Sequence, residues 1–235
     1  MSGRRKKRRF MVYLGILVVL VCFGITGLHQ VRKLVPGLQA KAVLSGESTS
    51  EEDWALVLVN KWNPTKDKTE IETTELWNGK RVDKRIYPYL QEMFDAMRKD
   101  GVYPVVASGY RTREEQQKLY DEKIQAYINE GYSKEQATEQ AQTWVAVPGT
   151  SEHELGLGID INADGIHSTG DEVYQWLEKN AHLYGFIYRY PQDKTEITGI
   201  SNEPWHYRYV GVKAAAEIRE QGICLEEYLE EKETF

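Results

Sequence analysis

The stretch that decides the fold reads SEHELGLGIDIN and spans residues 151–162. It places His153 and Asp160 seven positions apart, and a continuous strand would turn residues at that odd spacing to opposite faces. A helix is disfavoured by the two glycines between them and by the β-branched isoleucines that follow. We therefore expect a loop that carries His153 and folds back beside a strand that carries Asp160.

On the predicted strand, Ile159 and Ile161 face a core while Asp160 faces the other side. The glycines allow the loop backbone to approach the strand closely. A carboxylate in that place needs a partner, and a metal ion shared with His153 would provide one. The alternative is a solvated loop histidine and a solvated strand-edge aspartate, and the spacing alone does not decide between these interpretations.

A second cluster reads EPWHYRYV and spans residues 203–210, where it adds an imidazole and a carboxylate inside an aromatic, strand-like run. Pro204 interrupts the strand, so Glu203 need not follow the alternation that His206 follows. Alone, His206 is more simply interpreted as a core imidazole packed among aromatic rings. Taken with the first stretch, two histidines, one aspartate and a free glutamate make up a catalytic zinc site with an open fourth position.

The N-terminal region predicts a membrane anchor. A cytoplasmic basic tail at residues 1–9 precedes an uncharged, apolar run at 10–28. As a helix this run reaches about 28 Å, close to the roughly 30 Å of a bilayer core. The positive-inside rule then predicts a single-pass protein of the cell membrane with an extracytoplasmic domain. The alternative is a cleaved signal peptide, because residues 40–42 resemble a cleavage site, although they lie well beyond the apolar run.

The exported part of the chain is acidic and has little cysteine. Six of the 30 basic residues lie in the tail, which leaves 24 basic against 36 acidic residues and a net charge of −12. Such a surface does not suit nucleic acid, so we expect no nucleic-acid partner. Cys22 lies in the apolar run, so no disulfide is available after it, and we interpret Cys224 as a small hydrophobic packing residue.

A polar linker at 29–53 leads into a globular domain at 54–235. Its periodicity shows no βαβ alternation, which favours an α+β fold with a small antiparallel sheet, helices packed on it and the zinc site at the sheet. Capping boxes begin two of the expected helices, at Thr112 and Ser133. We expect helices at 86–97, 112–130, 133–144, 172–182 and 213–221, a short amphipathic turn near 225–229, and strands at 56–59, 102–107, 186–190 and 206–210.

Three motifs in order resemble a known family: SGYRT at 108–112, SxHxxGxxxD at 151–160 and EPWHYRY at 203–209. The chain is similar to the VanY-like D-alanyl-D-alanine carboxypeptidases, zinc peptidases of bacterial cell walls related to the VanX-like dipeptidases. The resemblance extends over about residues 56–229. L,D-carboxypeptidases of the same group share all three motifs, so the motifs indicate the family more closely than the substrate.

Carried over position by position, the resemblance implies a complete catalytic apparatus. Its zinc ligands are His153, Asp160 and His206. Glu203 becomes the general base that takes a proton from the attacking water, and Arg111 stabilises the developing oxyanion. The resemblance also implies two substrate contacts, Ser151 and Gln116.

The function that follows is a membrane-anchored, zinc-dependent D,D-carboxypeptidase. Its partner is a peptidoglycan stem pentapeptide, from which it removes the C-terminal D-alanine. One alternative is an L,D-carboxypeptidase acting on tetrapeptide stems. Another is a non-catalytic, zinc-containing module that binds the cell wall, but such a module would be expected to lack Glu203 or Arg111, and both are present.

Overall fold

The computed structural model describes residues 53–65 and 70–233. The predicted cytoplasmic tail and membrane anchor, and all but the last residue of the predicted linker, lie outside these ranges. Among the helices in the described ranges, none combines the length and the apolar character needed to cross a bilayer.

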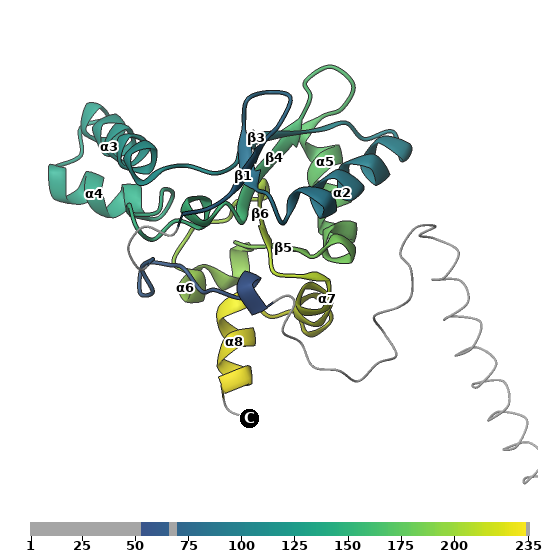
Figure 1. The fold of residues 1–235 in the computed structure, drawn as a ribbon. Coiled ribbons are helices and arrows are strands. Elements are labelled where there is room, and N and C mark those ends of the chain that lie inside the picture. The colour runs from purple at the N-terminus through teal and green to yellow at the C-terminus, as the bar shows by residue number, and fades with distance from the viewer. Residues whose placement is uncertain (1–52, 66–69, 234–235) are drawn as a thin grey trace, which may run out of the picture. The chain divides into compact units, whose positions relative to one another are not determined.

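A four-stranded antiparallel sheet forms the centre of the domain (Figure 1). Pro104 begins the edge strand β3, a place where its missing N–H group is tolerated. The sheet confirms the predicted α+β class. In spatial order its strands are β3 (Pro104–Ser108), β4 (Gly158–Ala163), β6 (His206–Tyr209) and β5 (Phe186–Tyr188).

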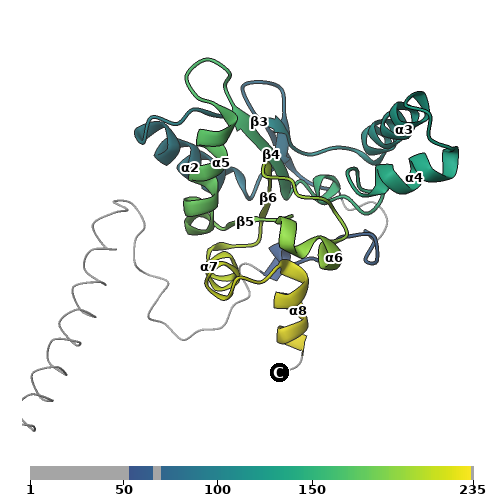
Figure 2. The same ribbon diagram turned by 180° about the vertical axis from the view of Figure 1, so that it is seen from behind.

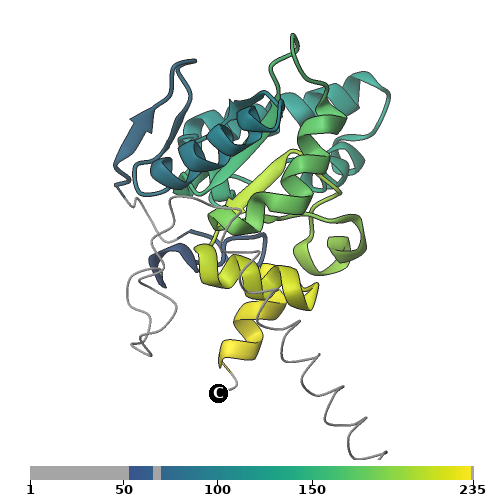
Figure 3. The same cartoon turned by 90° about the vertical axis from the view of Figure 1, so that its right-hand side faces the viewer.

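One face of this sheet is covered by α2 (Tyr87–Lys99) and α5 (Gly170–Asn180), which lie together in Figures 1 and 3. Ile159 and Ile161 of β4 are fully buried on that face, in one core with Met93 of α2. Each such side chain stabilises the fold by about 1.5–3 kcal/mol through burial. The strand alternation turns Asp160 to the opposite face, as predicted.

Helices α3 (Arg113–Asn129) and α4 (Lys134–Gln142) form a hairpin that projects on the other side of the domain from α2 and α5 (Figure 2). Both begin with the capping boxes that the sequence predicts, at Thr112 and Ser133. The hairpin is largely polar, but Gln116 of α3 is buried and faces the sheet's functional side.

The C-terminal region packs beside β5. Helix α7 (Val212–Gln221) is followed by α8 (Leu225–Glu233), a full helix where the sequence indicated only a short turn. Leu225 is completely buried in a second, smaller apolar cluster that includes Ile187 of β5. This burial explains the extra length, because most helical stability in proteins comes from packing of an apolar face.

The predicted strand at 56–59 is wrong. The carbonyl groups of Ala55 and Val57 instead accept hydrogen bonds from the buried guanidinium of Arg208, at 2.8 Å each. The sequence also did not indicate the hairpin formed by β1 (Thr73–Glu75) and β2 (Arg81–Asp83). The remaining helical segments are short: η1 (Asp53–Ala55), η2 (Glu152–Leu155), η3 (Ala181–Tyr184), η4 (Gln192–Lys194) and α6 (Thr195–Thr198).

Candidate active site

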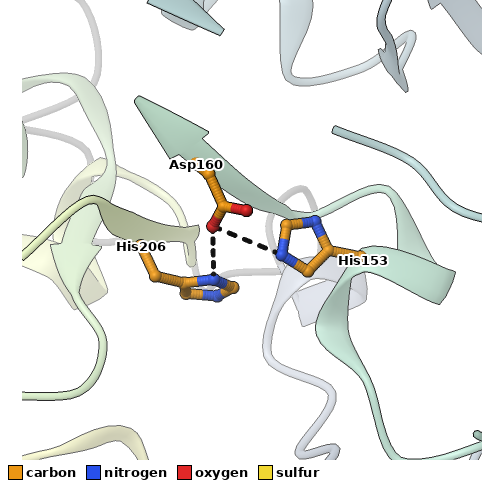
Figure 4. Close-up of side chains that lie close together, drawn as sticks. All are labelled: His153, Asp160 and His206. Carbon is orange, nitrogen blue, oxygen red and sulfur yellow. Dashed lines mark hydrogen bonds and ion pairs between the residues drawn. The ribbon is translucent and has the colours of Figure 1, made fainter. Parts of the chain in front are cut away.

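Strand register brings two of the proposed metal ligands together. In the β4–β6 ladder, Asp160 lies directly opposite His206, and both side chains leave the sheet on the face away from the core. Oδ1 of Asp160 lies 3.0 Å from Nδ1 of His206 (Figure 4). Residues 46 positions apart in the chain thus become neighbours because the two strands pair.

His153 reaches the same place from the short helix η2. Ser151 caps this helix by accepting a hydrogen bond from the His153 N–H group, and Gly156 ends it with a φ of +66°. Nε2 of His153 lies 3.4 Å from Oδ1 of Asp160 (Figure 4). The predicted loop that folds back beside the strand is therefore present, as one helical turn.

Gly158 makes room for the second histidine. A Cβ atom at this position would lie 3.1 Å from two atoms of the His206 ring and 3.0 Å from Cβ of Glu152. The glycine is required by close approach, in agreement with its structural interpretation from the sequence.

The hydrogen bonds behind the two rings determine which nitrogen faces the centre. Nδ1 of His153 lies 2.8 Å from the carbonyl oxygen of Gly109 and must donate to it, so Nε2 is left to bind a metal. Nε2 of His206 lies 3.3 Å from a carboxylate oxygen of Glu152 and donates to it, so Nδ1 faces Asp160. The two histidines therefore present opposite ring nitrogens to one point.

The donor set suits zinc. Two imidazole nitrogens and one carboxylate oxygen lie within 4.8 Å of one another, which matches three protein ligands with a position left open. Burial lowers the pKa of His153. Burial disfavours the charged form of Asp160, but His153 and His206 outweigh it and hold the pKa of that carboxyl well below its usual range.

His206 carries a proton that a metal would replace. Burial lowers the pKa of its ring, but hydrogen bonds to Asp160 and Glu152 outweigh burial and raise the pKa to about 9. At neutral pH the ring therefore donates to a carboxylate from each nitrogen. A cation held by His206 and Asp160 would take the place of the proton on Nδ1.

A pocket of about 150 Å³ opens beside the three ligands. Among the described residues that line it, Arg111 is the only arginine or lysine. Its Nη1 donates to Gln116 at 2.6 Å, and its Nη2 lies 3.7 Å from Oδ2 of Asp160. Its Nε–H group is buried and has no hydrogen-bond partner among the described residues.

Glu203 also lines the pocket, from the loop before β6. Its carboxylate lies 3.9 Å from Nδ1 of His206, and the residue as a whole is 9% exposed. Burial raises its pKa to about 7, although the nearby His206 partly opposes the shift. A carboxylate with this pKa exchanges a proton readily near neutral pH, as a general base requires.

Ser151 and Gln116 also line the pocket, but their polar atoms already have partners in the protein. Ser151 accepts from the His153 N–H group, and Gln116 both holds Arg111 and donates to the carbonyl oxygen of Ala146 at 2.7 Å. Ser151 thus helps to position His153, and Gln116 helps to position Arg111. Direct contact of either residue with substrate stays a prediction.

Sequence reasoning missed a group of buried charges behind the site. Glu152 contacts His206 and forms ion pairs with Arg189 and Arg208, at 2.8 and 3.0 Å. A signal was present, because both arginines lie between two tyrosines in strand-like runs, at 188–190 and 207–209. An arginine in such a run needs a buried counter-charge.

Comparison with known families agrees with this geometry. The family model described as "VanY: D-alanyl-D-alanine carboxypeptidase" matches residues 79–212, which include all the proposed site residues. The chain belongs to the VanY family. The resemblance that the three motifs suggested is confirmed.

Individual members of the family are closely similar. The D-alanyl-D-alanine carboxypeptidase of Enterococcus faecalis is 63% identical over 183 residues, which are 78% of this chain and 68% of that enzyme. Two solved VanY structures, one in complex with D-alanine-D-alanine and one with Zn(II), share 64% identity with a TM-score of 0.74. The alignments cover 75% of this chain and 98% and 99% of those chains.

A more distant structural neighbour is an LD-carboxypeptidase. The LdcB LD-carboxypeptidase is 34% identical with a TM-score of 0.57, over 74% of this chain and 84% of that chain. VanY membership and the Zn(II) complex of a VanY relative identify zinc as the metal of this family's site. The residues His153, Asp160 and His206 fit that metal here.

Proposed function

We propose that this chain is a zinc-dependent D,D-carboxypeptidase that removes the C-terminal D-alanine from peptidoglycan stem pentapeptides. The observation that carries the proposal is the arrangement of three groups around one small pocket. A metal triad, a glutamate with a raised pKa and a buried arginine all line it. VanY membership and the D-alanine-D-alanine complex of a relative support this substrate.

The residues of the chain divide the hydrolysis between them. Zinc, when bound by the triad, supplies a Lewis acid that makes water more acidic and polarises the peptide carbonyl. Glu203 takes a proton as the water oxygen bonds to the carbonyl carbon, and returns it to the leaving nitrogen as the carbon–nitrogen bond breaks. Arg111 offers a fixed, permanently charged donor to the substrate's oxyanion or terminal carboxylate.

The location of the enzyme is part of the proposal. The basic tail at 1–9 and the apolar run at 10–28 support a single-pass anchor in the cell membrane, with the catalytic domain outside the cytoplasm, where peptidoglycan lies. Sedimentation of the full-length protein with membranes checks this. Recovery of mostly soluble protein that begins at Val43 would mean instead that the chain is cleaved after residue 42, at the signal-peptidase-like site.

The experiment that tests the activity compares two stem peptides. The full-length protein is incubated with a pentapeptide that ends in D-alanyl-D-alanine and with the corresponding tetrapeptide, and the products are weighed by mass spectrometry. We expect one D-alanine to be released from the pentapeptide, activity to be lost with a chelator, and zinc to restore it. Cleavage of the tetrapeptide alone would make the chain an L,D-carboxypeptidase, and no cleavage of either would make it a binding module.

A further inference from the structure

Behind His206, a chain of buried charged side chains begins at Glu152, a residue that also lines the pocket. One carboxylate oxygen of Glu152 accepts from Nε2 of His206 at 3.3 Å, and the other accepts from Nε of Arg189 at 2.8 Å. That second oxygen also lies 3.0 Å from Nη1 of Arg208. The side chains of Glu152 and both arginines have no exposed surface, so water does not compete for these contacts.

Arg189 extends this chain to the C-terminal helix. Its two terminal nitrogens donate to the two oxygens of Glu226 on α8, at 2.8 and 2.6 Å. Such a two-bond fork fixes the plane and position of both groups. Asn60 donates to the same carboxylate at 3.0 Å, so Glu226 is itself held in place.

Charge balance couples the two glutamates. Two guanidinium groups face two carboxylates in this enclosed space: Glu152 accepts from Nε of Arg189, and Glu226 accepts from its two terminal nitrogens. Without the charge of Glu226, Arg189 would be held by Glu152 alone, and the arginine would draw that carboxylate away from His206. The partner behind a metal-binding imidazole orients the ring and increases its basicity as a ligand.

We propose that Glu226 is a positioning residue for the zinc ligand His206, and that it acts through Arg189 and Glu152. Glu226 holds Arg189, Arg189 and Arg208 hold Glu152, and Glu152 keeps a hydrogen on Nε2 of His206. Nδ1 of the ring is thereby turned to Asp160 and the metal. The inference rests on His206 as a zinc ligand and is independent of which stem peptide is cleaved.

The test measures zinc affinity of the full-length protein by competition with a chromogenic chelator, and the absorption spectrum of the cobalt(II)-substituted protein. Loss of an outer partner of a metal ligand typically costs about 10–100-fold in affinity, which is what we expect for Glu152→Gln. For Glu226→Gln, one residue further from the ring, we expect a loss of about threefold to tenfold on the same basis. The cobalt spectrum should change in both variants, because the ring moves relative to the metal.

Glu227→Gln is the matched control. Glu227 is the next residue on α8 and also carries an ion pair, but its partner is Lys194 at 2.9 Å, and it accepts from the backbone N–H group of Cys224. We expect this variant to keep wild-type zinc affinity and an unchanged cobalt spectrum. If Glu226→Gln does not fold, Glu226→Asp takes its place, since it keeps the charge but withdraws the carboxylate from Arg189.

A double variant shows whether Glu226 affects zinc binding through Arg189 and Glu152. In a Glu152→Gln background, the substitution at Glu226 should weaken zinc binding by less than about twofold further, because residues that act through one network are not additive. Wild-type zinc affinity in the single Glu226 variant, or an equal loss in both backgrounds, would overturn the proposal. Retention of stoichiometric zinc by His206→Ala would instead overturn the ligand assignment, whatever happens at Glu226.

Discussion

Two glutamates lie on opposite sides of His206, and their surroundings have opposite effects. Glu203 faces the pocket, where burial raises its pKa to about 7 against only partial opposition from His206 and Arg111. Glu152 lies behind the ring and is 1% exposed, so burial acts on it at least as strongly. Arg189 and Arg208 nevertheless outweigh burial and hold the pKa of Glu152 well below its usual range.

The difference shows that the counter-charges, rather than the depth of burial, separate the two roles. A carboxylate between two arginines is permanently ionised and can only accept hydrogen bonds, which suits the orientation of a ligand. A carboxylate with a pKa near neutrality can take and return a proton, which suits acid–base catalysis. Glu203 therefore lies on the side of His206 where proton transfer takes place. Glu152 lies on the side that holds the ring in position.

The largest effect that tests this comparison is expected for Glu203→Gln. The amide keeps the shape of the side chain but does not accept a proton, so turnover should fall by about 10²–10⁴-fold, as for loss of a positioned general base. Zinc content should stay at the wild-type value, because Glu203 is not one of the three ligands. D-Alanine release and bound zinc are measured on the same samples.

Glu152→Gln is the matching substitution behind the His206 ring. Its main effect should be weaker zinc binding. If the two variants lost zinc equally, the division between the chemical and the supporting side of His206 would be wrong. A Glu203→Gln variant that cleaves at the wild-type rate would remove Glu203 from the mechanism.

A second prediction concerns stability on the rear side. Arg208→Met should lower the free energy of unfolding by about 3–5 kcal/mol, the usual result of breaking a buried ion pair from one side. The substitution leaves Glu152 with one arginine and removes the donor to the carbonyl groups of Ala55 and Val57. Urea unfolding of the metal-free protein, with and without the substitution, measures the change.

Lys84→Met provides the control for this stability measurement. Lys84 and Glu72 form an ion pair at 3.3 Å with 66% and 84% of their side-chain surfaces exposed. Exposed pairs contribute only about 0–1 kcal/mol, so this substitution should have little effect. Equal losses in the two variants would contradict the structural role assigned to the buried pair.

The smallest predicted effect is the pH dependence of zinc binding. Because the pKa of His206 in the metal-free protein is raised to about 9, zinc must displace a proton from the ring below that pH. Between about pH 7 and 9, apparent affinity should therefore rise about tenfold, or 1.36 kcal/mol, for each unit of pH. Above the pKa of His206 the increase should stop.

Calorimetry in buffers of different ionisation enthalpy counts the proton released on zinc binding. We expect one proton near pH 8. An affinity independent of pH over this interval would mean that His206 is already neutral before the metal binds, and that its two carboxylate partners do not hold the extra proton.

Local features of this protein were predictable from the sequence, because they depend on neighbouring residues. The capping boxes at Thr112 and Ser133 and the alternation of Ile159, Asp160 and Ile161 all appear in the structure as predicted. Their causes act within a few residues: a side chain that bonds a free helix N–H group, and a backbone that turns successive side chains to opposite faces. The three motifs also indicated the family, which the comparisons confirm.

The tertiary structure alone decided which groups surround His206. Strand pairing places Asp160 beside its ring, η2 places Glu152 behind it, and helix packing brings Glu226 of α8 to Arg189. Another long-range contact occurs where the predicted strand at 56–59 is missing: the carbonyl groups of Ala55 and Val57 accept hydrogen bonds from Arg208. No local pattern encodes these contacts, because the distance between residues far apart in the chain depends on sheet register and helix packing. The opposite pKa shifts of Glu152 and Glu203 follow from that arrangement in space, and both residues are simply glutamates in the sequence.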